Sequence, residues 1–337
     1  MISDNNSYVD APMFSLNTDL SADVMCEAEA RIWVSETNRS LEEAAHRFWG
    51  DCAAGREVAM RLLKRFSETA AALESRGWSA EGIREHLAAS RRVFASSAFM
   101  RRCQDWPRGY AGDFETIEYL VAGANHSRPG TLGWHIEEIL LHSPVVQQHR
   151  NKLNYQSLEI ASTLMRSKAA RVLSIACGGC LDWIPILPQL NDFTGEIVLN
   201  DVEAAALQLA ERRLRSATTR YRITPGNIIR VAKRLANCPP FDLIVAGGLF
   251  DYLPNTAIVV LLRELQDLLT AGGILLFTNI AEDNPWRHLM EYGSNWNLNG
   301  RSEDRVLEIC RQAGIPRCIV TIKREPTRLT LITTVAR

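Results

Sequence analysis

The sequence predicts an α/β protein with a mostly parallel sheet in its second half and a helical subdomain before it. Two observations support this prediction. From about residue 22 to residue 100, apolar residues recur every three or four positions, as they do on helices, and no strand pattern interrupts them. After about residue 145, short runs rich in β-branched residues alternate with helical patterns, which is typical of a parallel sheet covered on both faces. We therefore divide the chain into an N-terminal helical subdomain, residues 1–145, and a sheet domain, residues 146–337.

The helical subdomain is predicted from three amphipathic stretches. They span residues 23–36, 40–77 and 79–97. Ser40 and Ser79 each stand ahead of glutamates, as N-cap residues do. The subdomain would either support the rest of the chain or close over it as a lid. A further helical stretch, residues 144–167, leads into the sheet domain.

The sheet domain is predicted from short strand-like runs. Four of them are expected to be parallel strands: residues 171–176, 195–201, 241–248 and 272–280. Helical patterns at 203–215 and 256–269 lie between them. The chain ends with "RCIVTIKRE" and "RLTLITTVA", which we expect to form two strands joined by a turn around Pro326.

The composition indicates a globular protein that does not bind nucleic acid. Lysine and arginine number 38 against 39 acidic residues, so no overall positive field would gather nucleic acid. The longest apolar runs, such as residues 258–262, are far shorter than a membrane span, and the start of the chain lacks the pattern of a secretory leader. The eight cysteines are scattered, as reduced thiols usually are. We expect a cytoplasmic protein with no membrane or nucleic-acid partner.

The stretch "RVLSIACGGCLDW", residues 171–183, runs from a strand into a turn of small residues. It could be a CxxC redox or zinc pair, a nucleotide-binding turn, or an ordinary bend. Only Cys177 and Cys180 form a CxxC, and the second cysteine or histidine pair that a structural zinc needs is missing, so we expect no metal. Asp201 ends the next strand 23 residues after Gly178, which is the spacing of a carboxylate that binds ribose hydroxyls. This pairing favours a nucleotide site.

The region from about 168 to 337 resembles class I S-adenosylmethionine (SAM) dependent methyltransferases. It has the glycine turn, Asp201, "GNII" (226–229), "FDLIVAGGLFDYLP" (241–254) and "LLTAGGILLFTNI" (268–280) in the order of that family. The resemblance implies a Rossmann-like fold, with seven mostly parallel strands, an antiparallel last strand, and SAM across the strand ends as substrate or methyl donor. The GxGxxG fingerprint of NAD-binding proteins is absent.

The same resemblance implies a set of SAM contacts. Ala176, Gly178 and Gly179 would lie against the methionine part, Asp201 would bind the ribose, Asn227 would lie near the adenine edge, and Gly247 and Phe250 would flank the sulfonium. Where the family has an acidic residue and three alternating glycines, this chain has Ser174, Ala176, Gly178 and Cys180. Alanine and cysteine are small enough to keep a close approach to the ligand.

Three further stretches resemble a narrower group. They are "WPRGYAGDFETIEYL" (106–120), "RNKLNYQ" (150–156) and "NPWRHLMEYGSNWNL" (284–298). This combination is similar to azetidine-2-carboxylate synthases of bacterial secondary metabolism, and also to methyltransferases linked to 3-hydroxy fatty acid methyl ester signals. In the synthases the α-amine of SAM attacks its own γ-carbon, and 5'-methylthioadenosine leaves.

We therefore expect intramolecular cyclisation of SAM, with methyl transfer to a small-molecule or fatty-acid-like acceptor as the alternative. A SAM-binding module without catalysis is a third interpretation. The catalytic candidates are Tyr110, Asn154 and Tyr252, because uncharged polar groups could orient an unprotonated amine and aromatic rings attract the sulfonium. Loss of the acidic residue at Ser174 predicts a pocket poor in carboxylates.

Each candidate also has a structural interpretation. Asp113 could cap a helix ahead of Glu115 and Glu118, Asn154 could cap or pack a helix, and Tyr252 could close a strand turn. The tryptophans of the last stretch, Trp286 and Trp296, would fill space beneath a lid. If the reaction is methylation, Asp251, Glu291 or His288 could serve as the base.

Overall fold

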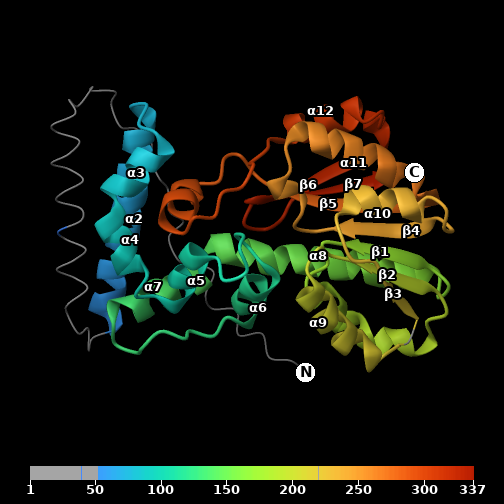
Figure 1. The fold of residues 1–337 in the computed structure, drawn as a ribbon, viewed down its shortest axis with the longest axis horizontal. Helices are drawn as coiled ribbons and strands as arrows, with labels where there is room; N and C mark the ends of the chain where they lie inside the picture. Colours follow the sequence, from blue (N-terminus) through green and yellow to red (C-terminus); the bar gives the residue numbers. More distant parts are fainter. Residues whose placement is uncertain (1–38, 40–51, 219) are drawn as a thin grey trace.

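The computed structural model describes residues 39, 52–218 and 220–337 (Figure 1). Helices gather at one end of the elongated molecule and the sheet lies at the other, with α8 (Pro144–Arg166) running between them. The predicted helix over 23–36 and the predicted N-cap Ser40 lie outside the described residues. No described helix is both long enough and apolar enough to cross a membrane.

The helical part confirms the periodicity of the sequence. Its helices are α2 (Cys52–Ser75), α3 (Ala80–His86), α4 (Ala88–Phe94), α5 (Ala98–Asp105), α6 (Phe114–Ala122) and α7 (Leu132–Leu141). The Ser79 side chain accepts a hydrogen bond from the Gly82 backbone N–H, so the predicted cap is confirmed. The single helix expected over 79–97 is divided into α3 and α4 at Leu87.

The sheet has seven strands in the order β3-β2-β1-β4-β5-β7-β6, which confirms the predicted fold class. The strands are β1 (Arg171–Ile175), β2 (Glu196–Asn200), β3 (Tyr221–Ile223), β4 (Phe241–Ala246), β5 (Leu269–Ile280), β6 (Val320–Arg324) and β7 (Thr330–Ala336). Strand β7 is antiparallel to both β5 and β6, while β1 to β5 are mutually parallel. Only β3 has no counterpart among the predicted runs, because it is three residues long and none of them is fully buried.

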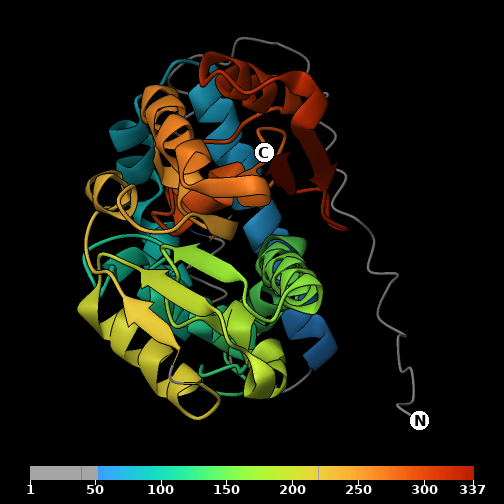
Figure 2. The same cartoon turned by 90° about the vertical axis from the view of Figure 1, so that its right-hand side faces the viewer.

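Helices cover both faces of the sheet (Figure 2). One face packs against α8, the 3₁₀ segment η1 (Leu181–Asp192) and α9 (Ala204–Arg215). The other packs against α10 (Ile228–Leu235), α11 (Asn255–Asp267) and α12 (Glu303–Gln312). Two short 3₁₀ turns, η2 (Phe250–Tyr252) and η4 (Arg317–Ile319), complete this part. Both layers arise because parallel strands buried on two faces need apolar cover on each.

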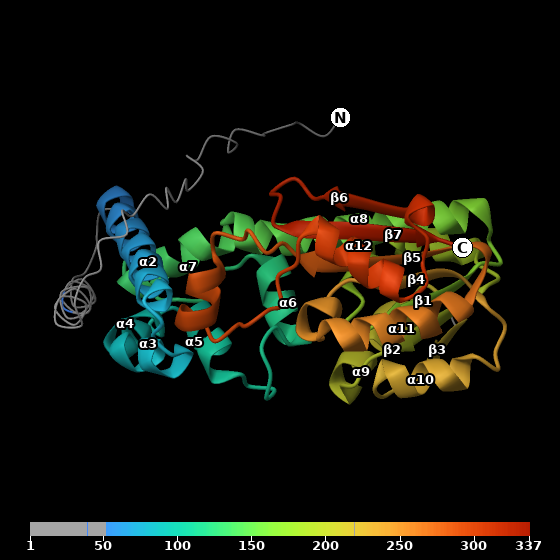
Figure 3. The ribbon, with the colours of Figure 1, turned by 90° about the horizontal axis from the view of Figure 1, so that it is seen from above.

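The segment that follows β5 returns to the helical part. It contains the π turn η3 (Leu289–Gly293), which lies beside α2 and α5 (Figure 3). Trp286, Met290 and Trp296 are buried in the same apolar core as Phe66 of α2 and Met100 of α5. Trp286 thus fills space, as its structural interpretation expects. The helical part therefore draws its core from both halves of the chain.

Candidate functional site

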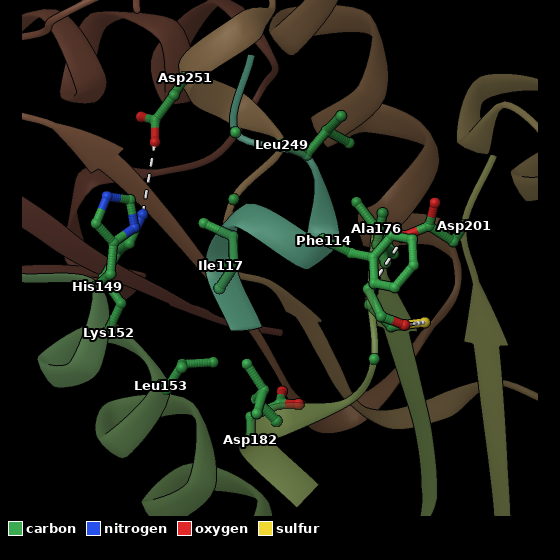
Figure 4. A pocket seen from close by; sticks show the side chains of 18 of the residues that line it. Phe114, Ile117, His149, Lys152, Leu153, Ala176, Asp182, Asp201, Leu249 and Asp251 are labelled. Carbon is green, nitrogen blue, oxygen red and sulfur yellow. Dashed lines mark hydrogen bonds and ion pairs between the residues drawn. The ribbon is translucent and has the colours of Figure 1, made fainter. Parts of the chain in front are cut away.

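A cavity of about 300 Å³ lies between the sheet and the helical part (Figure 4). The carboxyl ends of β1, β2 and β4 form one side, and α6 and α8 form the other. The strand order reverses between β1 and β4, and in open α/β sheets ligands bind outside the strand ends at such a switch point. The fold therefore positions the cavity where a nucleotide-like ligand is expected.

The turn after β1 has left-handed backbone at every second residue. The φ angles are 48° at Ala176, 52° at Gly178 and 59° at Cys180. These are the three positions at which the resemblance expects glycine. The left-handed conformation is unfavourable by roughly 1–2 kcal/mol for a residue with a Cβ, because the Cβ crowds the backbone carbonyl oxygen. Ala176 and Cys180 therefore hold this conformation against a steric penalty. Strain of this kind at a cavity wall is typical of a functional turn.

Asp201 braces the same turn from the end of β2. One carboxylate oxygen accepts a hydrogen bond from the Gly178 backbone N–H at 2.9 Å, and the other accepts one from the Glu203 N–H at 2.9 Å. Burial raises the pKa of the carboxyl above its ordinary value. Asp201 lines the cavity beside Gly178 and Val202. A carboxylate here can accept hydrogen bonds from ribose hydroxyls while it holds the turn.

Asp182 is a second buried carboxyl at the turn, and the sequence interpretation missed it. Burial raises its pKa from 3.8 to about 7. The Ser157 hydroxyl of α8 donates a hydrogen bond to the Asp182 backbone carbonyl at 2.6 Å, which fixes the first residues of η1. Ser174, which stands where the family has its acidic residue, instead accepts a hydrogen bond from the Trp183 indole N–H at 3.0 Å. Asp182 thus returns a carboxyl to this end of the cavity.

The prediction of a cavity poor in carboxylates is therefore wrong. Four acidic side chains line it: Glu118, Asp182, Asp201 and Asp251. The carboxylate that the family has at position 174 is missing, but acidic residues from other elements line the cavity instead. A comparison limited to the glycine turn does not detect them. The nearest sequence signal was the aspartate two residues beyond the CxxC.

Lys152 and Asp251 form a buried ion pair on the far wall. Lys152 Nζ and Asp251 Oδ2 are 3.8 Å apart, and the other Asp251 oxygen accepts a hydrogen bond from the Ile280 N–H at 2.6 Å. Burial raises the pKa of the aspartate and lowers that of the lysine. His149, one turn earlier on α8, stacks on Trp296 with ring centroids 5.3 Å apart, and burial holds its pKa well below the ordinary range. Figure 4 shows Lys152 and Asp251 facing each other across this end of the cavity.

Of the three possible bases for methylation, only Asp251 lines this cavity. His288 and Glu291 lie on the segment that packs against α2. His288 hydrogen-bonds to Glu74, and Glu291 pairs with Arg287 at 3.1 Å. These partners, Glu74 of α2 and Arg287 of the same segment, hold both side chains away from the strand ends.

Three polar contacts join α6 and the loop before it to α9 and its N-cap residue Glu203. The Tyr110 hydroxyl donates a hydrogen bond to Glu203 at 2.6 Å, and Arg108 pairs with the other oxygen of Glu203 at 2.5 Å. Arg213 of α9 pairs with Glu118 of α6 at 2.6 Å. Burial, and then the bond to Glu203, raise the pKa of Tyr110. These contacts hold the loop before α6 over the glycine turn.

The rest of this loop is shaped by a cap and a close contact. Asp113 accepts a hydrogen bond from the Thr116 N–H at 3.0 Å, so its structural interpretation as the N-cap of α6 is confirmed. Gly112 has a φ of +68°, and a Cβ there would overlap the Tyr252 hydroxyl. That hydroxyl accepts a hydrogen bond from the Trp296 indole N–H at 2.9 Å. The "GYAGD" stretch therefore needs its second glycine to reach the cavity wall.

The structure brings together seven of the ten predicted site residues. The residues that line the cavity are Tyr110, Tyr252, Ala176, Gly178, Gly179, Asp201 and Gly247. A Cβ at Gly247 would overlap the buried amide of Gln156 on α8, and one at Gly179 would overlap Arg213 and Glu118. These two glycines therefore allow the strand ends to approach the helices closely.

The other three predicted residues lie away from the cavity. Asn154 is exposed, because α8 turns His149, Lys152 and Gln156 toward the cavity instead. Asn227 is exposed at the N-terminus of α10 and caps it by accepting a hydrogen bond from the Ile229 N–H at 2.9 Å. Phe250 is fully buried and stacks on Phe277 with ring centroids 4.6 Å apart. Helix phase turns Asn154 away from the cavity and core packing turns Phe250 away, while no residue of the stretch 226–229 lines the cavity.

The described residues contain no group of three or more His, Cys, Asp or Glu side chains arranged to hold a metal ion.

Comparisons with known proteins agree with this geometry. Residues 173–275 match the family model described as a methyltransferase domain. A possible exported protein from Bordetella parapertussis has a similar fold, with 16% identity, a TM-score of 0.53, and coverage of 92% of this chain and 96% of that one. No curated protein matches the chain.

Two further solved structures are less similar. Magnesium protoporphyrin IX methyltransferase from Synechocystis with bound SAH has 11% identity, a TM-score of 0.45, and coverage of 66% of this chain and 92% of that one. A SAM-dependent methyltransferase from Archaeoglobus fulgidus has 11% identity, a TM-score of 0.40, and coverage of 54% and 94%. The match over residues 173–275 and the order of the strands are those of the Rossmann-like class I fold.

Proposed function

We propose that the protein binds SAM in this cavity and closes its methionine part into azetidine-2-carboxylate, with release of 5'-methylthioadenosine. The observation that supports ring closure most directly is Asp182, a buried carboxyl beside the glycine turn with a pKa of about 7. Such an enzyme would supply a non-protein amino acid to bacterial secondary metabolism. It would act on a small molecule in the cytoplasm and need no metal.

The cavity suits SAM in size and in the character of its walls. Its volume of about 300 Å³ is at the lower end of the range for small-molecule sites. Asp201 would hold the ribose hydroxyls, as carboxylates at this strand end do in nucleotide-binding folds. The turn at Ala176 and Gly178 would lie against the methionine part, where the small residues leave the backbone accessible.

Ring closure requires that the α-amine of SAM lose a proton. The nitrogen then attacks the γ-carbon, the N–Cγ bond forms, the Cγ–S bond breaks, and the electron pair of that bond stays on sulfur. A free α-amine has a reference pKa of about 8. A carboxylate with the ordinary aspartate pKa would accept this proton poorly. Burial raises the pKa of Asp182 to about 7, which is close to the pKa of the amine. Asp182 is therefore suited to general base catalysis near neutral pH.

The sulfonium requires a dry, electron-rich surrounding. Tyr110, Phe114 and Tyr252 line the cavity between the turn and α6. An aromatic face attracts a cation by roughly 0.5–2 kcal/mol, and more strongly where water is excluded. The bonds from Tyr110 and Arg108 to Glu203 would keep the roof closed over the reacting atoms. Orientation of amine and γ-carbon in one closed site supplies much of the acceleration of an intramolecular reaction.

Methyl transfer to an acceptor is the second candidate function. It is favoured by the buried pair of Lys152 and Asp251, because the cavity continues past the turn to this pair and to Tyr252 and Trp296. An acceptor, small or fatty-acid-like, could lie there with Asp251 as its base. The product would then be S-adenosylhomocysteine instead of methylthioadenosine.

Product analysis with SAM as the sole substrate separates the two candidates. Purified protein is incubated with SAM beside an enzyme-free control, because SAM breaks down spontaneously, and the products are identified by mass spectrometry. Enzyme-dependent azetidine-2-carboxylate with methylthioadenosine is the result we expect. SAM that stays intact would contradict cyclisation and direct the search to a methyl acceptor.

A further inference from the structure

The glycine turn carries a cysteine pair that neither candidate reaction uses. Cys177 and Cys180 flank Gly178 and Gly179. Cys177 is partly exposed and lines the cavity, whereas Cys180 is fully buried in the core beneath the sheet, among residues that include Trp183. One thiol is thus open to small molecules and the other is shielded from them.

The backbone already holds these two cysteines at disulfide range. The Cys180 backbone N–H donates a hydrogen bond to the Cys177 carbonyl at 2.9 Å, which closes a β-turn over residues 177–180. In a β-turn the first and last Cα atoms are less than about 7 Å apart, and disulfides span Cα distances of about 4.4–6.8 Å. The neighbouring Cys177 thiol, and then burial, raise the pKa of Cys180 well above its ordinary value.

We propose that Cys177 and Cys180 are an oxidisable dithiol and that their disulfide closes the cavity to SAM. The two sulfurs would be drawn together into a bond of about 2.0 Å. That movement pulls Cys177 toward the core and displaces Gly178, whose N–H is bonded to Asp201. The disulfide therefore disturbs the turn and the ribose-binding carboxylate together.

The oxidant would be a peroxide, and the step balances as a two-electron oxidation. The exposed Cys177 sulfur attacks the O–O bond, becomes a sulfenic acid, and releases one water. The Cys180 sulfur then displaces the hydroxyl of the sulfenic acid, and a second water leaves with the thiol proton. Two thiols and one peroxide thus give one disulfide and two waters. Cys180, buried and protonated, acts as the resolving thiol rather than as the site of first attack.

The test is disulfide mapping of the full chain after treatment with hydrogen peroxide, combined with SAM-binding calorimetry. Trypsin releases residues 172–212 as one peptide, which contains Cys177 and Cys180 and no other cysteine. We expect this peptide to lose two hydrogens and to resist alkylation until it is reduced. SAM affinity should fall at least about tenfold, as for loss of a hydrogen bond to a charged group, and return when a dithiol reductant is added.

Variants assign the effect to this pair. Each is compared before and after oxidation, so that its own starting affinity is the reference. Cys177→Ser and, separately, Cys180→Ala should bind SAM equally in both states. Cys238→Ser and Cys318→Ser, which change cysteines away from the cavity, should remain as sensitive as the wild type.

Two results would overturn the inference. One is a 172–212 peptide that stays fully alkylatable while the exposed Cys318 is oxidised. The other is a mapped disulfide that leaves SAM affinity unchanged. The inference goes beyond the proposed reaction, since a failure of cyclisation would leave SAM bound but intact and would not alter either readout.

Discussion

Replacing Asp182 with asparagine should make the protein more stable at alkaline pH and less active. Burial raises the pKa of this carboxyl from 3.8 to about 7. A rise of about three in pKa corresponds to about 4 kcal/mol between the protonated and ionised forms. The folded state therefore disfavours the ionised carboxylate by about that amount, whereas an unfolded chain ionises it freely.

The sign of the pH effect follows from these two pKa values. Below about pH 4 the carboxyl is protonated in both states and contributes nothing. Between about 4 and 7 the unfolded state loses the proton first, so stability falls as pH rises, and above about 7 the full cost is present. Asparagine has the same shape and cannot ionise. Asp182→Asn should thus match the wild type near pH 4 and exceed its free energy of unfolding by up to about 4 kcal/mol near pH 8.

The assay is urea unfolding of wild type and variant at both pH values, followed by SAM turnover. Loss of a general base lowers turnover by about a hundredfold or more. Asp192→Asn, at the exposed end of the same segment η1, is the matched control and should behave as the wild type throughout. A variant that is less stable near pH 8, or that retains full turnover, would refute the role assigned to Asp182.

Three further changes test the walls of the cavity. Gly247→Ala would force a Cβ into the Gln156 amide and should lower the free energy of unfolding in urea by about 1–3 kcal/mol. Gly248→Ala has open space around its Cβ and should lower it by less than half as much. Equal losses for the two variants would contradict the packing. Asp201→Ala should weaken SAM binding at least about tenfold in calorimetry, since it removes a charged acceptor; unchanged affinity would remove it from the site. Tyr110→Ala should slow turnover far more than it lowers the melting temperature, because the side chain is 38% exposed; a variant that only unfolds would return Tyr110 to a structural role.

The sheet could be predicted almost completely because its signals are local. Each predicted strand is a short β-branched run, and each lies where the structure has a strand. Gly178, Asp201 and Gly247 could be placed at the cavity for the same reason. Each lies just beyond the end of a strand, and the sheet sets the position of those ends.

The helical contribution to the site could not be predicted at the level of single side chains. The stretch "RNKLNYQ" does contribute side chains to the cavity, but the face of α8 that meets the cavity depends on its packing against the sheet. That packing exposes Asn154 and presents Lys152 and Gln156. Asp182 escaped notice because its raised pKa comes from burial, and burial is a property of the assembled fold. Trp296 reaches the cavity only because the segment after β5 folds back onto the helices.

The most direct test of the account follows the methyl group of SAM itself. SAM with a deuterated methyl group is given to the protein without any acceptor, and each product is identified by mass spectrometry beside an enzyme-free sample. Ring closure predicts that all of the deuterium stays on methylthioadenosine, which forms in equal amount to unlabelled azetidine-2-carboxylate. SAM that stays intact, or deuterium on any other molecule with S-adenosylhomocysteine as the coproduct, would contradict cyclisation.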